Sequence, residues 1–332
     1  MPAPTPAADP KSKGVPKELL RALRQIEILT SRLATDALAG AYTSVFRGQG
    51  IVFREVRPYQ PGDDIRQIDW NVSARTGETF VKLFTEEREM TVMLLVDVSA
   101  SQHFGTVRAP KGRLAAEIAA LLAFSAIKGG DRVGLVMVSD RVERIVPPRK
   151  GEKHVLRVTR EVLAGAQPWM RDDATAGEGH TEPTGRGTDL AAGIEALTRL
   201  AKRRSVAFVI SDFFVGDGDA RARARFERVL ALAAAKHDVI AVELVDPRDD
   251  ELPDVGLATL EDLETGESRL VDTGEARVRE AYARAARARR KSIRDTFKRL
   301  AIDAIVARTD GSYVKPIRDL FARRARRARS GR

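Results

Sequence analysis

One stretch, Met90–Ser101 with the sequence MTVMLLVDVSAS, constrains the fold of this chain more than any other. Its apolar run is short, contains β-branched residues and gives way to small polar ones, which is typical of a strand buried on both faces. Asp97, Ser99 and Ser101 follow at alternating positions, so a carboxylate and a pair of hydroxyls stand at the carboxyl end of this strand. Ligands of open α/β sheets bind at that edge. The stretch therefore predicts an α/β fold with a ligand site at the end of a buried strand.

The rest of the main domain alternates predicted strands with predicted helices. Further buried strands are expected at 133–138, 206–210, 239–245 and 304–307. The expected helices cover 113–128, 151–163, 188–201, 220–235 and 275–300, and a last one begins near Pro316. Residues 141–146 are expected to form a hairpin with the strand before them, and 257–263 a peripheral hairpin with 268–272. Alternation of this kind predicts a doubly wound, mostly parallel α/β sheet.

Changes in composition divide the chain into successive parts. Residues 1–14, rich in Pro, Ala and Lys, are expected to be disordered. Residues 15–89 contain an amphipathic N-terminal helix and then a small β-rich charged segment, and both are expected to pack on the main domain. The main domain covers 90–325, and 326–332 form a basic tail. Gly, Thr, Asp and Glu dominate 167–187, which is expected to be a long loop of the kind that is usually functional or mobile.

Opposite charges crowd residues 57–75, RPYQPGDDIRQIDWNVSAR. One interpretation is a site for an anion or for a partner protein. The other is an arginine–carboxylate network that fastens this segment to the sheet, and we favour it because charges so closely interleaved tend to satisfy each other. Trp70, one of 2 tryptophans in the chain, is expected to be an anchor in the packed structure.

Composition excludes several classes of site. None of the 332 residues is a cysteine, which excludes disulfides, thiolate metal sites and cysteine nucleophiles and fits a reducing compartment. No apolar run approaches the roughly 18 residues that a membrane-spanning helix needs, and the N-terminus lacks the apolar core of a signal peptide. We therefore expect a soluble, cytoplasmic protein.

The net charge of +10 arises from 57 Lys and Arg residues, and much of the excess lies in 318–332. A positive field can attract nucleic acid, anionic lipid or an acidic protein. The favoured interpretation of the 318–332 segment is a solvated helix end, because cations are stabilised at a helix C-terminus. Aromatic residues make up only 5% of the chain, which argues against a stacking platform for single-stranded nucleic acid.

Polar residues at strand ends and helix starts supply the candidate metal ligands. Asp97, Ser99 and Ser101 form one cluster, Thr188 precedes a predicted helix, and Asp212 follows a predicted strand. Hard oxygens of this kind suit Mg²⁺, or Mn²⁺ or Ca²⁺, and Mg²⁺ typically takes only one or two carboxylates. Each residue also has a structural interpretation, since Asp, Ser and Thr cap helices and satisfy the amides of turns. The order of all of them along one α/β chain favours the metal site.

The same residues carry a resemblance to known families. Asp-x-Ser-x-Ser at 97–101, Gly-Thr-Asp at 187–189 and Asp212 resemble the metal-ion-dependent adhesion site of von Willebrand factor A domains. That resemblance implies direct ligation by Ser99, Ser101 and Thr188, with Asp97 and Asp212 acting directly or through water. Gln102 and His103 follow where a methionine is common, and His103 is either an extra ligand or simply exposed.

A wider resemblance covers roughly residues 40–325. The run Pro-Gly-Asp-Asp…Ile-Asp-Trp…Ala-Arg at 61–75, leading into the Asp-x-Ser-x-Ser strand, is similar to the bacterial family called domain of unknown function 58. The resemblance implies a von Willebrand A-like fold. It also implies a shared chaperone-like or remodelling task with a MoxR-type AAA+ ATPase, because members are often encoded beside one.

The leading hypothesis is therefore a protein-interaction module, not an enzyme. It would use Mg²⁺ to take a carboxylate from a partner protein, working with the MoxR-type ATPase and a protein client. One alternative is a magnesium-dependent phosphatase-like enzyme with Asp97 as nucleophile, although Ser99 stands where a haloacid-dehalogenase-type phosphatase needs a second carboxylate. The other is a nucleic-acid binder acting through the basic surface, for which no recognition motif is present. There is no P-loop and no Gly-x-Ser-x-Gly elbow.

Overall fold

The computed structural model describes residues 17–34, 38, 42, 45, 52–85, 89–105, 109–165, 187–215, 219–262 and 267–330. The predicted disorder of 1–14 and nearly all of the predicted 167–187 loop lie outside these residues.

A six-stranded sheet forms the centre of the molecule, in the order β10-β7-β6-β3-β4-β5. β5 runs antiparallel to β4, and every other pair is parallel. This confirms the prediction of a doubly wound, mostly parallel sheet. The strands are β3 (Thr91–Asp97), β4 (Arg132–Val138), β5 (Val142–Arg149), β6 (Val206–Ser211), β7 (Asp238–Val245) and β10 (Asp303–Arg308).

The strand that begins the main domain lies inside the sheet, not at its edge. From β3 the chain moves outward through β4 and β5 and then returns to place β6 on the other side of β3. The order of the strands therefore reverses between β3 and β6. In open α/β sheets, ligands bind outside the carboxyl ends of the strands at such a reversal. The predicted site residues lie there, since Asp97 ends β3 and Asp212 follows β6.

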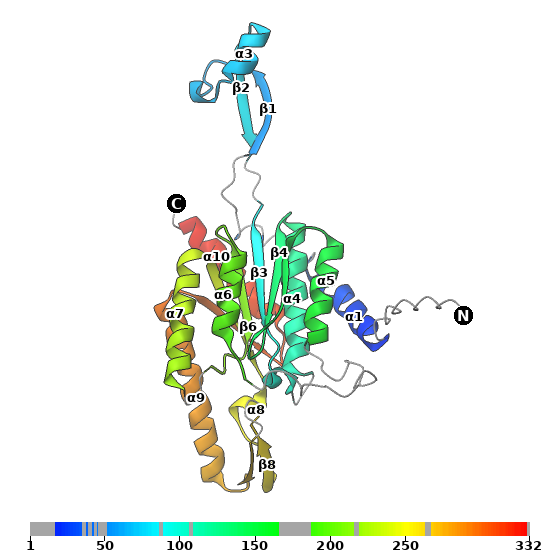
Figure 1. The fold of residues 1–332 in the computed structure, drawn as a ribbon, viewed down its shortest axis with the longest axis vertical. Helices are drawn as coiled ribbons and strands as arrows, with labels where there is room; N and C mark the ends of the chain where they lie inside the picture. Colours follow the sequence, from blue (N-terminus) through cyan, green and yellow to red (C-terminus); the bar gives the residue numbers. More distant parts are fainter. Residues whose placement is uncertain are drawn as a thin grey trace, which may run out of the picture.

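Helices cover both faces of the sheet (Figure 1). Along β3, Leu94 and Val96 pack into one layer while Met93 and Leu95 pack into the other, because successive side chains of a strand point to opposite faces. The first layer includes α1 (Lys17–Leu33), α4 (Lys111–Lys128), α5 (Glu152–Gly165) and α10 (Val314–Ser330). The second includes α6 (Leu190–Leu200), α7 (Ala220–Lys236) and α9 (Ala276–Arg299).

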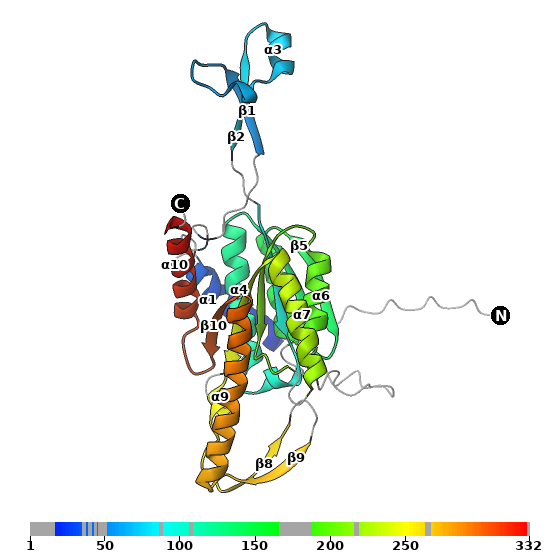
Figure 2. The ribbon, with the colours of Figure 1, turned by 90° about the vertical axis from the view of Figure 1, so that its left-hand side faces the viewer.

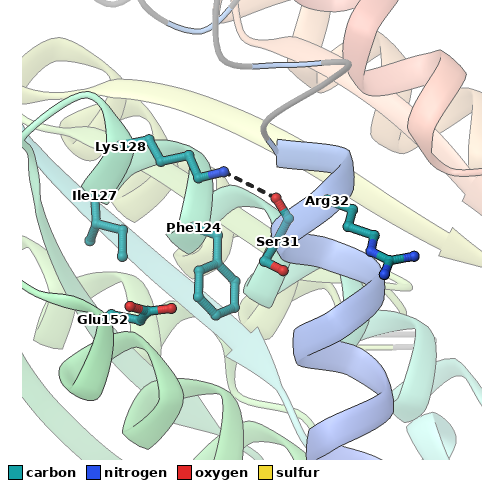
Figure 3. Close-up of a pocket in the computed structure, with 6 residues that line it drawn as sticks. All are labelled: Ser31, Arg32, Phe124, Ile127, Lys128 and Glu152. Carbon is teal, nitrogen blue, oxygen red and sulfur yellow. Dashed lines mark hydrogen bonds between the residues drawn. The ribbon is translucent and has the colours of Figure 1, made fainter.

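The N-terminal helix packs on the main domain as predicted. Ile26 of α1 is buried in the same core as α4 and α5. Lys128 of α4 donates a hydrogen bond from Nζ to the carbonyl of Ser31, 3.1 Å away, near the C-terminal end of α1. Figure 3 shows this contact beside a shallow pocket of about 350 Å³ lined by Phe124 and Glu152 among others. The contact ties the C-terminal end of α1 to α4.

Within the part of the chain that the structure describes, the charged segment does not pack on the main domain, which corrects the prediction for this part of 15–89. Among the described strands, β1 (Val52–Pro58) and β2 (Phe80–Thr85) pair only with each other, joined through η2 (Ile65–Gln67) and α3 (Trp70–Thr76). We call residues 52–85 the arm. Figures 1 and 2 show the arm projecting from the end of the body where β3 begins, opposite α8 and the β8–β9 hairpin.

The charges of the arm satisfy each other within the arm. Arg57 forms a bidentate ion pair with Asp63, at 2.8 and 2.7 Å. Asp69 accepts hydrogen bonds from the first turn of α3 and lies 3.5 Å from Lys82. One Arg–carboxylate pair of the predicted network, Arg57–Asp63, is therefore present within the arm, and it does not fasten this segment to the sheet as predicted. Trp70 is 70% exposed, so it is not an anchor.

Two further elements lie at the opposite end of the body, beyond the carboxyl ends of the strands (Figure 2). These are α8 (Pro247–Asp250) and the predicted hairpin of β8 (Leu257–Glu261) and β9 (Ser268–Asp272). The expected basic tail is helical as far as Ser330, because α10 continues to that residue, and Arg324 of α10 forms ion pairs with Asp238 and Asp303. Among the described residues, none of the helices is both long enough and apolar enough to cross a bilayer.

Candidate metal site

Asp97 is the last residue of β3, and its side chain is fully buried, with 0% exposure. Its Oδ1 accepts a hydrogen bond from the amide of Ser99 at 2.9 Å. Its Oδ2 accepts one from Ser211 Oγ at 2.6 Å, across the reversal point between β3 and β6, and a longer one from Gln102 Nε2 at 3.4 Å. All of these donors are neutral. Among the described residues, no cationic side chain contacts this carboxylate.

Burial and a neighbouring carboxylate make the charge of Asp97 costly. Desolvation is the main cause, and the negative charge of Asp212 is the second; together they raise the pKa of Asp97 from 3.8 to about 6, against the lowering effect of the hydrogen bonds from Ser211 and Ser99. A bound cation would act in the opposite direction by favouring the ionised form.

Ser99 and Ser101 are also buried, and their hydroxyl oxygens lie 3.1 Å apart. Ser99 precedes η3 (Ala100–His103), yet its side chain makes no capping hydrogen bond to that turn. It is Asp97 that satisfies an amide of this turn, because its carboxylate accepts a hydrogen bond from the amide of Ser99. The hydroxyls of this cluster face each other and remain able to offer oxygen lone pairs.

Asp212 follows β6 and is paired with a lysine that sequence analysis did not identify. Lys111 Nζ lies 2.8 Å from Asp212 Oδ2 and 3.2 Å from Asp249 Oδ2, and the lysine is only 1% exposed. Burial lowers the pKa of Lys111, but Asp212 and Asp249 raise it by more, so the ammonium is charged. The ring of Phe214, 5.0 Å from Nζ, adds a cation–π contact. Lys111 therefore compensates Asp212 and Asp249.

Thr188 lies at the same edge of the sheet, two residues before the start of α6. The neighbouring Asp189 donates its amide to the carbonyl of Ser139, which follows β4, at 2.7 Å. The side chain of Asp189, and not Thr188, caps α6 by accepting from the amide of Ala192 at 3.0 Å. The structural interpretation of Thr188 as the helix cap is therefore wrong, and its ligation of a metal stays a prediction.

The structure thus brings Asp97, Ser99 and Ser101 together and places Asp212 close enough to influence the charge of Asp97. Around these residues, Ser211 donates to Asp97, and Lys111 pairs with Asp212 and Asp249. The side chain of His103 lies outside the described residues. Within those residues no three His, Cys, Asp or Glu side chains gather as a metal-binding group, so the predicted ligand set depends on hydroxyl oxygens.

The sequence matches a family described as "Protein of unknown function DUF58" over residues 55–292. The chain belongs to the DUF58 family. This DUF58 protein is 35% identical to the uncharacterised protein Rv1480 of Mycobacterium tuberculosis over 314 residues, which are 95% of this chain and 92% of the relative. It is 27% identical to the uncharacterised protein YeaD of Bacillus subtilis over 134 residues, which are 40% of this chain and 31% of YeaD.

An aerotolerance-related membrane protein from Bacteroides fragilis superposes on this DUF58 protein with a TM-score of 0.42 and 14% identity, covering 72% of this chain and 99% of the other.

Proposed function

We propose that this DUF58 protein is a metal-dependent protein-interaction module that takes a carboxylate from a partner protein. Mg²⁺, or Mn²⁺ or Ca²⁺ in its place, would be held by oxygen ligands at the reversal point of the sheet. The proposed ligands are Asp97, Ser99, Ser101, Thr188 and Asp212.

The observation that carries this proposal is the environment of Asp97. A fully buried carboxylate is costly unless it is paired, and here every hydrogen-bond donor to it within the described residues is neutral. Asp212, nearby, has its own ammonium partner in Lys111. The site therefore has one compensated carboxylate and one uncompensated carboxylate, together with a pair of buried hydroxyls. That donor set fits a hard divalent cation, which takes oxygen ligands and needs few carboxylates.

The ion would supply an open coordination position for an oxygen of the partner protein. Asp97 would provide the negative charge that retains it, and Ser99 and Ser101 would orient neutral oxygens toward it. Phe104 and Gly105, which follow the buried cluster in the chain, are partly exposed, and so is Thr188. The proposal requires a partner carboxylate to reach the ion past residues of this kind.

The proposed partner is a MoxR-type AAA+ ATPase, and the proposed task is assembly or remodelling of a client complex in the cytoplasm. This part of the proposal rests on the resemblance of residues 40–325 to a family whose members are often encoded beside such ATPases. ATP hydrolysis would belong to the partner, because this chain has no P-loop.

Capture of the ATPase tests the proposal directly. The full-length protein, immobilised, is incubated with the MoxR-type ATPase of the same organism in Mg²⁺ and, separately, in EDTA. We expect retention in Mg²⁺ that is lost in EDTA and in Ser101→Ala. Ser125→Ala is the matched control: Ser125 is also buried, but it bonds to Leu121 within α4 and lies away from the strand ends.

Equal retention in Mg²⁺ and in EDTA, or by Ser101→Ala, would refute a metal-dependent interaction. Mg²⁺-dependent release of phosphate from a generic phosphate ester, lost in Asp97→Asn, would instead support the enzyme. Retention of DNA that falls steeply with salt would support the nucleic-acid binder.

A further inference from the structure

Gln102 is the residue of the candidate site whose hydrogen bonding is incomplete. It is fully buried, and its Nε2 lies 3.4 Å from both Asp97 Oδ2 and Ser101 Oγ. Its Oε1 has no hydrogen-bond partner among the described residues. Buried polar atoms are nearly always satisfied, so an orphaned oxygen a few ångströms from an uncompensated carboxylate requires an explanation.

The orientation of the carboxamide suits a site without a cation. In this orientation the amide group donates toward the Asp97 carboxylate, which has no cationic partner among the described residues. A cation held by Asp97 and Ser101 would face the hydrogens of the same Nε2, and that contact would be repulsive. A cation in contact with both Asp97 and Ser101 is therefore incompatible with the present orientation of Gln102.

A half-turn of the carboxamide about its last torsion removes this conflict. The turn exchanges nitrogen for oxygen with almost no change of shape, since the two ends of a carboxamide are nearly identical in size. Oε1 loses no hydrogen bond when it leaves its present position, because it has none within the described residues. After the turn, an oxygen is directed toward Asp97 and Ser101, and oxygen is the donor that hard cations prefer.

We propose that Gln102 is a further residue of the metal site, with its amide nitrogen donating to Asp97 in the empty site and its carboxamide oxygen turned toward the cation in the loaded site. This inference rests on the proposed metal-dependent function. It adds a neutral ligand, so the net charge of the site does not change. The unsatisfied Oε1 is the cost of keeping this oxygen available.

Binding of Mn²⁺ to full-length variants tests the inference. Free Mn²⁺ is followed by its electron paramagnetic resonance signal, with Mg²⁺ as competitor. We expect Gln102→Met, which keeps the length of the side chain and removes the amide, to weaken binding about 10-fold or more. Gln102→Glu is expected to bind at least as tightly as the wild type, because it offers an oxygen at the same place. The matched control is Gln67→Met, an exposed position on the arm, which is expected to leave binding unchanged.

A second measurement on the wild type does not depend on how a variant folds. The side-chain ¹H–¹⁵N pair of Gln102, assigned by its disappearance in Gln102→Met or Gln102→Glu, is expected to shift on addition of diamagnetic Mg²⁺. Wild-type binding with an unchanged affinity in Gln102→Met, or a Gln102 amide that does not respond to Mg²⁺, would overturn the role of Gln102 and leave the metal site standing. No Mn²⁺ binding by the wild type would overturn the proposed function together with this inference.

Discussion

Asp97→Asn should make the metal-free protein more stable. The pKa of Asp97, raised from 3.8 to about 6 mainly by burial and then by Asp212, means that the ionised carboxylate destabilises the folded state. A difference of that size corresponds to about 3 kcal/mol at pH 7. Asn has nearly the same shape, carries no charge and can still accept the hydrogen bond from the Ser99 amide. For a chain of 332 residues, this gain corresponds to a melting temperature about 4 °C higher.

The gain should depend on pH and on metal in a defined way. Because the folded-state pKa lies above the unfolded one, the destabilisation is complete above about pH 6 and absent below about pH 4. In EDTA, the difference between Asp97→Asn and the wild type should therefore shrink as the pH falls from 8 to 4. Mg²⁺ at about 100 times its dissociation constant should stabilise the wild type by about 2.7 kcal/mol and leave Asp97→Asn unchanged.

Thermal and urea unfolding between pH 4 and pH 8, in EDTA and in millimolar Mg²⁺, measure these differences. Asp131→Asn is the matched control. Asp131 is also buried, and its carboxylate is bonded to Tyr42 and to the amide of Met90 at the opposite edge of the sheet. It should not affect the response to Mg²⁺. A metal-free Asp97→Asn protein that is less stable than the wild type at pH 8, or a difference that is independent of pH, would refute the reasoning.

Three further changes test other parts of the structure. Lys111→Met should destabilise the protein by about 3–5 kcal/mol in urea unfolding, because it leaves Asp212 and Asp249 buried without their ammonium; a loss below about 1 kcal/mol would contradict the buried triad. His237 is buried without a hydrogen-bond partner for either ring nitrogen among the described residues, and burial, followed by the charges of Lys236 and Arg204, lowers its pKa from 6.5 to about 4. Stability should therefore fall as the pH drops from about 6.5 toward 4, and His237→Leu should remove about 2 kcal/mol of that loss at pH 5; equal pH profiles for both proteins would contradict this. Trp70→Ala should change the free energy of unfolding by no more than about 0.5 kcal/mol, because the indole is 70% exposed; a larger loss would show that the arm packs more closely than described.

The sheet, and the gathering of Asp97, Ser99 and Ser101 at one of its edges, could be predicted because the local patterns agree with the global fold. The apolar run that ends at Asp97 can be buried only as a central strand, and the alternation of strands and helices leaves few topologies. Asp97, Ser99 and Ser101 lie within a few residues of each other, so the end of one strand brings them together. Their proximity needs no knowledge of the rest of the chain.

The surroundings of the site could not be predicted, because they depend on contacts between distant residues. Lys111 lies 101 residues from Asp212 and 138 from Asp249, and a lysine at the start of a helix normally reads as exposed. The same difficulty explains why the placement of the arm could not be predicted. Interleaved charges indicate that Arg57 and Asp63 can satisfy each other, but the pattern does not say whether they do so within a hairpin or across an interface. Trp70 is an example. An aromatic residue in a charged run can be a buried anchor or an exposed side chain, and its sequence neighbours do not decide between the two.

The arm and the site stand at the two ends of one strand, which gives the molecule a mechanical axis. β2 of the arm ends at Thr85, β3 begins at Thr91, and Asp97 is the last of its seven residues, about 20 Å along the strand. Parallel neighbours hold β3 on both sides, so a pull on the arm loads their hydrogen bonds together, in shear. If β3 slid by one residue past its neighbours, Leu94 would turn into the opposite core layer. This cost opposes gradual sliding of the strand. Tension applied to the arm is therefore taken up by the strands beside β3, which shields the carboxylate at the far end of the strand.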